Sequence, residues 1–191
     1  MEQSIRALIA TSDGALASEV AQSLALDFHW RPVAAPTFRV ALAEIRNSTF
    51  DLVLIDRDLD GGDGIVFAPI VKKRNPRCRT LLLSSHNRWA THDAATTLGF
   101  DAVLGRHYPV QELAELLVEQ SRMRAVPSHP LLATLTVREL EILNDLATGL
   151  TNHEIAQLRG ISEATTKSHL SSIYRKLRAR NRVEAISLLR S

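Results

Sequence analysis

Two carboxylates, three hydroxyls and one guanidinium follow short apolar runs in the first 121 residues. Each run, such as 51–55 (DLVLI), has the length and composition of a buried strand. In a parallel sheet the carboxyl ends of the strands meet at one edge, where ligands bind. We expect this edge to carry Thr11, Ser12, Asp13, Asp56, Ser84 and Arg106. A carboxylate at such a place, as Asp56 is, can attack a phosphoryl donor and become an aspartyl phosphate.

A second candidate set lies on one face of a helix predicted over 162–177. At 100° per residue, four polar residues share an arc of about 100°, and none of them is bulky or apolar. Small side chains let a helix approach the major groove closely, while lysine and arginine reach base edges or phosphates. The set is Lys167, Ser168, Ser171 and Arg175. It predicts binding to double-stranded DNA.

The elements that must position the first set alternate between strand and helix. Candidate strands are 5–10, 29–34, 51–55, 80–84 and 101–104. Helical patterns lie between and after them, at about 14–25, 37–47, 65–73, 89–98 and 109–122. This alternation predicts an α/β fold built on a doubly wound parallel sheet of five strands.

The second set belongs to a region that is helical throughout. The segment 124–130 (RAVPSHP) breaks the periodicity with two prolines, which indicates a linker. Helices are expected at about 136–147, 151–158, 162–177 and 182–190. The expected organisation is therefore an α/β domain over 1–121, a linker over 122–133 and an all-α four-helix domain over 134–191.

The ends of these helices carry recognisable signals. Gly149 and Gly160 stand where the first two helices should end. Three helices begin with a capping residue three positions before a glutamate, a spacing that predicts a capping box. The three pairs are Thr136/Glu139, Thr151/Glu154 and Asn181/Glu184.

Charge and composition limit the partners of the chain. Residues 1–121 carry a net charge of −3 and residues 122–191 one of +5. A basic C-terminal part suits a polyanion, although a solvated basic face without a partner remains an alternative. Cys78 is the single cysteine, so no intrachain disulfide can form.

The sequence gives no sign of a membrane or metal partner. It has no uncharged apolar stretch long enough to span a bilayer, and its N-terminus makes a poor signal peptide. We therefore expect a cytoplasmic protein. His86, His92 and His107 lack metal-ligand spacing, so no metal site is expected among them.

The sequence over 135–186 resembles the LuxR-type output domain of the NarL/FixJ response regulators. The matching residues include Leu135, Thr136, Arg138, Glu139, Glu141, Gly149, Leu150, Asn152, Glu154, Ile155, Ala156, Ile161, Ser162, Thr165, Lys167, His169, Ile173, Lys176, Leu177, Arg182 and Ala185. The resemblance implies a helix-turn-helix whose recognition helix corresponds to 162–177. It places Lys167, Ser168 and Ser171 at DNA-facing positions, and Thr165 and His169 join the candidate DNA-binding residues.

Two residues of this region depart from the family pattern. Arg159 stands where the family usually has an apolar residue, so we expect a repacked turn before Gly160. Thr166 replaces a common valine, and its hydroxyl can bond back to the helix.

The last helix is a candidate dimerisation element. Val183, Ile186 and Leu189 form an apolar stripe, and in the family this helix typically pairs two subunits. A homodimer on DNA is expected. Alternatively, the stripe packs within its own domain.

Residues 5–121 resemble the receiver domain of the same regulators, which implies a flavodoxin-like fold. The resemblance makes Asp56 the candidate phosphoacceptor, followed by a glycine-rich loop over 61–64, and Ser84 the hydroxyl that senses the phosphoryl group. A sensor histidine kinase or another regulatory protein is then an expected partner. Asp56 is alternatively a relic of ancestry.

The remaining receiver positions depart from the family pattern. The acidic pair that ends the first strand in the family reads Thr11-Ser12 here, with Asp13 one residue later. The family's lysine position reads Arg106, which can hold Asp56 by a bidentate pair. Asp58 adds negative charge to the same pocket. Mg²⁺ is expected as a cofactor only if this pocket is functional, because Mg²⁺ favours anionic oxygens.

The leading hypothesis is a transcription regulator, not an enzyme, with a degenerate receiver that does not depend on phosphorylation of Asp56. The first alternative is a conventional phosphorylation-switched response regulator. A remote alternative is a haloacid-dehalogenase-like phosphatase, because DLVLIDRDLD places Asp-x-Asp after a buried strand. A third is an adaptor that binds only protein.

Overall fold

The computed structural model describes residues 4–85, 95–96, 98–125 and 131–188. The chain divides into two compact units, residues 1–128 and residues 129–191. The division falls inside the segment predicted to be a linker. Each unit has its own hydrophobic core.

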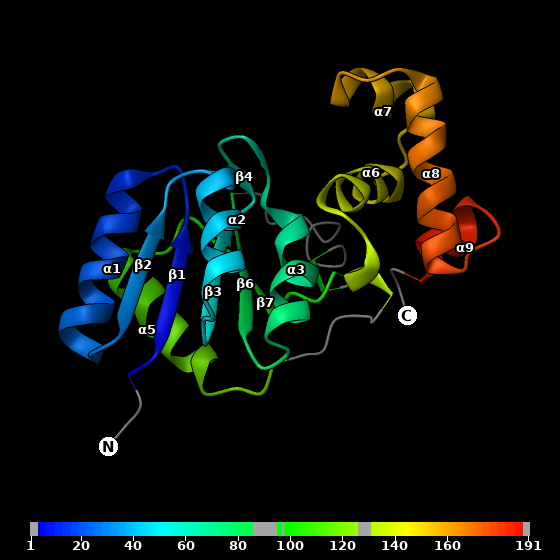
Figure 1. Ribbon diagram of the computed structural model, residues 1–191. Coiled ribbons are helices and arrows are strands. Elements are labelled where there is room, and N and C mark those ends of the chain that lie inside the picture. The colour runs from blue at the N-terminus through cyan, green and yellow to red at the C-terminus, as the bar shows by residue number, and fades with distance from the viewer. Residues whose placement is uncertain (1–3, 86–94, 97, 126–130, 189–191) are drawn as a thin grey trace. The chain divides into compact units, whose positions relative to one another are not determined.

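The first unit is built on a five-stranded parallel sheet (Figure 1). The strands are β1 (Arg6–Ala10), β2 (Arg31–Ala35), β3 (Leu52–Asp56), β6 (Arg79–Ser84) and β7 (Ala102–Gly105). Their order is β2-β1-β3-β6-β7, which is the flavodoxin-like order. The predicted doubly wound sheet is confirmed, and each predicted strand lies within two residues of its observed position.

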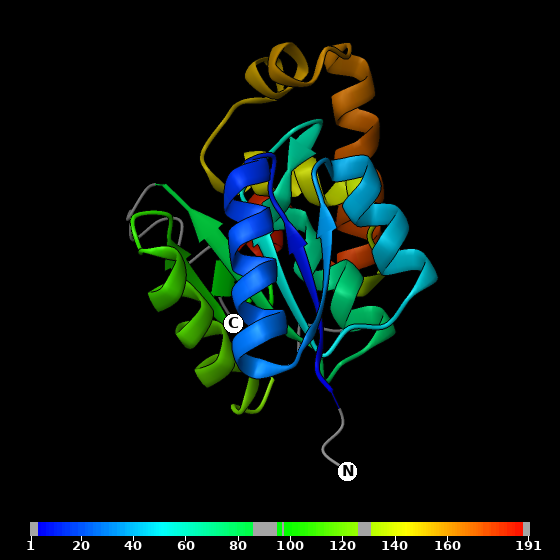
Figure 2. The ribbon, with the colours of Figure 1, turned by 90° about the vertical axis from the view of Figure 1, so that its left-hand side faces the viewer.

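Helices cover both faces of this sheet. α1 (Gly14–Phe28) and α5 (Val110–Ser121) lie side by side on one face, and α2 (Phe38–Asn47) and α3 (Phe67–Arg74) lie on the other (Figure 2). Alternate strand residues pack beneath α1 and α5, such as Ile9, Leu54 and Leu83. Most of the helix expected at 89–98 lies outside the described residues.

The loop after β3 forms a small structure that the sequence patterns did not predict. β4 (Asp58–Leu59) pairs antiparallel with β5 (Gly62–Asp63), and a 3₁₀ turn, Gly64–Val66, leads into α3. A Cβ atom at Gly64 would lie 2.0 Å from the backbone oxygen of Asp56. Glycine at 64 therefore lets the loop fold back tightly against the end of β3.

The second unit consists of helices. A 3₁₀ turn (Leu132–Thr134) precedes α6 (Val137–Ala147), α7 (Asn152–Arg159), α8 (Glu163–Leu177) and α9 (Arg182–Ser187). The buried face of α8 is made of Thr166, Leu170, Ile173 and Leu177. The first three predicted helices agree with these within one residue. The last helix was expected to run to 190, but it ends at Ser187, and Leu188 is its C-cap.

Two of the three predicted capping boxes are present. Thr136 with Glu139 and Thr151 with Glu154 exchange both hydrogen bonds. At the third start, the Asn181 side chain accepts from the Glu184 backbone N–H, as expected. The Glu184 carboxylate instead accepts from the backbone N–H of Arg180, 2.7 Å away. Asn181 is therefore an ordinary N-cap, and the capping-box prediction was wrong there.

Candidate functional sites

Asp56 ends β3 in a buried pocket at the carboxyl edge of the sheet. Its side chain has 0% exposure. Its Oδ2 atom accepts a hydrogen bond of 2.8 Å from the Thr11 hydroxyl and forms an ion pair with the Arg106 guanidinium. Its Oδ1 atom accepts from the backbone N–H of Asp58 at 3.1 Å. Both carboxylate oxygens are thus occupied by groups of the protein itself.

The strand register explains why these three side chains meet. Ala10 of β1 lies opposite Ile55 of β3, so the next residue on each strand, Thr11 and Asp56, are neighbours. Arg106 follows β7 at the same edge, and its Nη2 atom also donates to the Thr11 hydroxyl at 3.3 Å. Ser84 is buried at the end of β6 on this edge.

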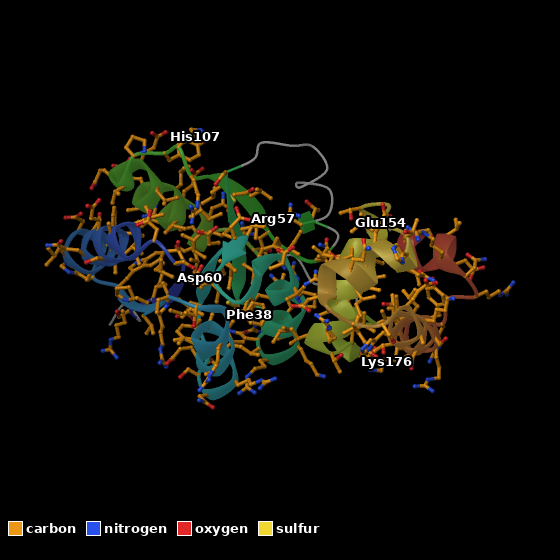
Figure 3. The ribbon with its side chains drawn as sticks, turned by 90° about the horizontal axis from the view of Figure 1, so that it is seen from above. Phe38, Arg57, Asp60, His107, Glu154 and Lys176 are labelled. Carbon is orange, nitrogen blue, oxygen red and sulfur yellow. The ribbon has the colours of Figure 1, made fainter. Side chains whose placement is uncertain are left out.

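The other expected pocket residues have local structural roles. Asp13 caps α1, because its carboxylate accepts from the Leu16 backbone N–H at 3.0 Å. The Ser12 hydroxyl accepts a hydrogen bond from the backbone N–H of Asp60. Asp60 is labelled in Figure 3. The Asp58 residue is exposed to solvent.

This donor set does not match what Mg²⁺ requires. Mg²⁺ takes hard anionic oxygens in octahedral geometry, whereas the Asp56 oxygens are bound by a guanidinium, a hydroxyl and an amide. The Asp13 carboxylate is engaged as a helix cap. Within the described part of the chain, no group of three His, Cys, Asp or Glu side chains could hold a metal ion. His86 and His92 lie outside the described residues.

The expected DNA-facing side of α8 is exposed. Thr165, Lys167, Ser168, Ser171 and Arg175 are all exposed, and His169 is half-buried. Lys167 has 63% side-chain exposure and pairs with Glu163 at 3.0 Å. The Ser171 hydroxyl donates to the backbone oxygen of Lys167 at 3.0 Å. The arrangement presents two cations and small hydroxyls on one side of α8.

A buried glutamate fixes α8 to α6. Glu139 accepts hydrogen bonds from Lys176 Nζ at 2.6 Å and from the Ser172 hydroxyl at 2.8 Å, besides its capping bonds to Thr136. Lys176 is labelled in Figure 3. Burial opposes ionisation of Glu139, but the hydrogen bonds from Lys176, Thr136 and Ser172 outweigh it and lower its pKa to about 2. Sequence patterns indicated only the capping role of Glu139.

The departure at Arg159 creates an ion network between α6 and α7. The Arg159 guanidinium binds the Asp145 carboxylate through Nε at 2.6 Å and Nη2 at 2.8 Å. Its Nη1 atom lies 3.4 Å from Glu141, which also pairs with Arg138 at 2.9 Å. An ionic contact therefore occupies this position, which is usually apolar in the family.

The hydroxyl of Thr166 behaves as expected. It donates to the backbone oxygen of Ser162, the N-cap of α8, at 3.2 Å. Thr166 is fully buried, so this bond satisfies a hydroxyl in the place of a methyl group.

The expected dimerisation stripe is only partly described. Val183 has 74% exposure, Ile186 is half-buried, and Leu189 lies outside the described residues. The buried residue of α9 is Ala185, which packs inside the unit. Arg182 secures the start of α9 by donating to the backbone oxygens of Leu146 and Leu150, each at 3.0 Å.

None of the helices in the described part of the chain is long and apolar enough to cross a membrane.

Comparison with known proteins agrees with this architecture. The Response regulator receiver domain model matches residues 7–118, and the model for bacterial regulatory proteins of the luxR family matches residues 133–189. The response regulator protein VraR of Staphylococcus aureus is 29% identical over 160 residues, which cover 76% of this chain and 77% of VraR.

Solved structures share the fold of the whole chain. RcsB of Salmonella enterica serovar Typhimurium, bound to promoter rprA, has a TM-score of 0.59 at 18% identity and covers 99% of this chain and 100% of its own. Full-length FixJ of B. japonicum has a TM-score of 0.50 at 19% identity and covers 96% of this chain and 95% of its own. The chain therefore belongs to the response regulators of the NarL/FixJ type, with a receiver domain followed by a LuxR-type DNA-binding domain.

Proposed function

We propose that this chain is a sequence-specific DNA-binding transcription regulator whose receiver domain does not depend on phosphorylation of Asp56. The ion pair between Arg106 and the buried Asp56 carboxylate is the observation that carries this proposal. It supports a receiver held in one state by its own side chains. The regulator acts in the cytoplasm, and its receiver answers to another regulatory protein or a ligand rather than to phosphoryl transfer from a sensor kinase.

The electrostatics of the pocket oppose phosphorylation. A phosphoryl group adds nearly two negative charges, and phosphoryl transfer relies on cations for most of its stabilisation. Thr11 and Ser12 replace the acidic pair that would hold Mg²⁺, and the Asp13 carboxylate serves as a cap. Arg106 supplies positive charge but competes with an incoming phosphoryl group for the same Asp56 oxygen.

The phosphatase alternative is less well supported. It needs a second carboxylate that acts beside Asp56. Asp58 is exposed, and its backbone N–H, rather than its carboxylate, contacts Asp56. The relatives of the chain are response regulators.

Asp56 variants test the receiver part of the proposal in cells. We expect Asp56→Asn and Asp56→Ala to keep reporter output within about twofold of wild type, because no phosphoryl switch is lost. Asn keeps the size of the side chain, and Ala removes its pairing with Arg106. Both variants are compared by reporter assay and by protein level. Loss of output in both at normal protein levels, together with a gain in wild-type DNA affinity on treatment with acetyl phosphate and Mg²⁺, would show that phosphorylation of Asp56 is required.

DNA binding is tested on Lys167. The affinity of the full chain for a DNA duplex that carries its binding sequence should fall steeply with rising salt. The reason is that basic side chains displace counterions from the DNA phosphates. Lys167→Ala should weaken binding by about 1–3 kcal/mol if the side chain reads a base edge. The matched control is Lys73→Ala, because Lys73 is an exposed lysine of α3 in the other unit. Equal affinity of wild type and Lys167→Ala would refute the role of α8 as the recognition helix.

Footprints from the same titrations report on dimerisation. We propose a homodimer that protects two half-sites about one helical turn apart. Val183 of the predicted stripe is exposed on α9, where it can contact a partner subunit. Protection of a single half-site at all concentrations would argue for a monomer.

A further inference from the structure

At the start of α8, the Glu163 carboxylate lies between two basic side chains, those of Lys167 and His153. Its Oε1 atom lies 3.0 Å from Lys167 Nζ, and its Oε2 atom lies 4.0 Å from Nδ1 of His153 on α7. The side chains of Glu163, Lys167 and His153 are all exposed, at 45%, 63% and 67%. Neither Glu163 nor His153 belongs to the DNA-facing set predicted from the sequence.

The position of Glu163 in α8 aligns it with that set. It is the first residue of the helix, directly after the N-cap Ser162. Steps of four residues lead from Glu163 to Lys167, Ser171 and Arg175, which therefore form one row on the helix surface. In helix-turn-helix proteins, the N-terminal residues of the recognition helix contact base edges. Glu163 therefore heads the row of residues proposed to face DNA.

An ionised carboxylate has few favourable partners in DNA. The hydrogen bond from Lys167 lowers the pKa of Glu163, so the side chain is an acceptor without a proton to donate. Phosphates repel it, and so do the guanine acceptors in the major groove. The exocyclic amino group of cytosine is a donor that glutamate reads there, whereas lysine reads the guanine acceptors.

The Lys167–Glu163 pair is also free to rearrange on DNA. An exposed ion pair between residues i and i+4 contributes little to stability. Breaking or turning it therefore costs little compared with a base contact.

Building on the proposed DNA-binding function, we propose that Glu163 is a specificity-determining residue. Its carboxylate accepts a hydrogen bond from the amino group of a cytosine in the major groove. At the same time it holds the Lys167 ammonium toward a neighbouring guanine. Glu163 thereby lowers affinity for unrelated sequences, because base acceptors and phosphates repel a carboxylate that meets no amino group.

Selection from a random duplex library by the full chain tests this proposal. Wild type, Glu163→Gln and Glu163→Ala are compared with the control Glu115→Gln, which changes an exposed glutamate of α5. We expect wild type and the control to select the same motif. Glu163→Gln should lose about tenfold of its discrimination for cytosine at one position of each half-site. Glu163→Ala should lose the same preference and bind the unselected pool more tightly.

The outcomes separate specificity from folding and from DNA binding as such. A purely structural role would weaken binding to every sequence, whereas the proposed role changes one base position and raises non-specific affinity. An unchanged motif in both Glu163 variants would overturn the proposal while leaving DNA binding intact. If wild type enriches no motif, the proposed DNA-binding function fails, and the role of Glu163 fails with it.

Discussion

Replacing Arg159 with leucine is expected to lower the free energy of unfolding of the C-terminal unit by about 3 kcal/mol. Arg159 supplies two hydrogen bonds to the Asp145 carboxylate, and both side chains are largely buried. Leucine restores the apolar character that the family usually has at this position. It nevertheless leaves the Asp145 charge buried without that partner, and the cost of the unpaired charge exceeds the gain in apolar packing.

A second substitution distinguishes the ion pair from simple packing. Asp145→Leu combined with Arg159→Leu should recover stability to within about 1 kcal/mol of wild type, because a buried ion pair is often replaceable by apolar residues. Arg180→Leu is the control, since Arg180 is exposed, and should change stability by less than about 0.5 kcal/mol.

Urea unfolding of the full chain provides the measurement. The methyl signals of Ile142 and Ile155, both buried in the C-terminal unit, report its unfolding separately from the receiver. An Arg159→Leu variant as stable as wild type would contradict the importance of the network. So would a double variant less stable than the single one.

Glu139→Gln should destabilise the same unit in a pH-dependent way. The pKa of Glu139 in the folded chain is about 2, below its ordinary value of 4.5. Its ionised form is therefore favoured by folding, and this stabilisation is fully present above pH 4.5 and is lost as the pH falls toward 2. The shift corresponds to about 3 kcal/mol. Glutamine keeps the capping geometry but not the charge.

We expect the stability difference between wild type and Glu139→Gln to be about 3 kcal/mol at pH 7 and to vanish near pH 2. The same methyl signals, followed in urea at several pH values, measure it. Glu115→Gln on the receiver is the control and should leave these signals unchanged. A difference that stays constant between pH 7 and pH 2 would show that Glu139 acts through packing and neutral hydrogen bonds.

The fold was predictable because its signals are periodic and local. Short apolar runs such as 51–55 match buried parallel strands, and the caps at Thr136 and Thr151 mark helix starts where they occur. The small β4–β5 hairpin was missed because two-residue strands have no periodicity. The expected box at Asn181 failed because the Glu184 carboxylate accepts from the backbone N–H of Arg180 instead of that of Asn181.

The sites were predictable only in part. Strand order brings Thr11, Asp56 and Arg106 together, and parallel topology is enough to expect this. Asp13 was expected in the pocket, but its carboxylate caps α1. An aspartate after a strand can bind either the start of the next helix or a distant side chain, and its residue type does not decide between the two. The Asp145–Arg159 contact joins residues fourteen positions apart on two helices, so only the packing of α6 and α7 shows it.

The central claim is that DNA binding does not require a phosphoryl group on Asp56. The most direct test is fluorescence anisotropy of the selected duplex with the full chain, with and without Mg²⁺ and beryllofluoride, a phosphoryl mimic. Because Arg106 already occupies the Asp56 carboxylate, the two affinities of wild type should agree within about twofold. A tightening of tenfold or more in wild type that is absent from Asp56→Ala would contradict the account.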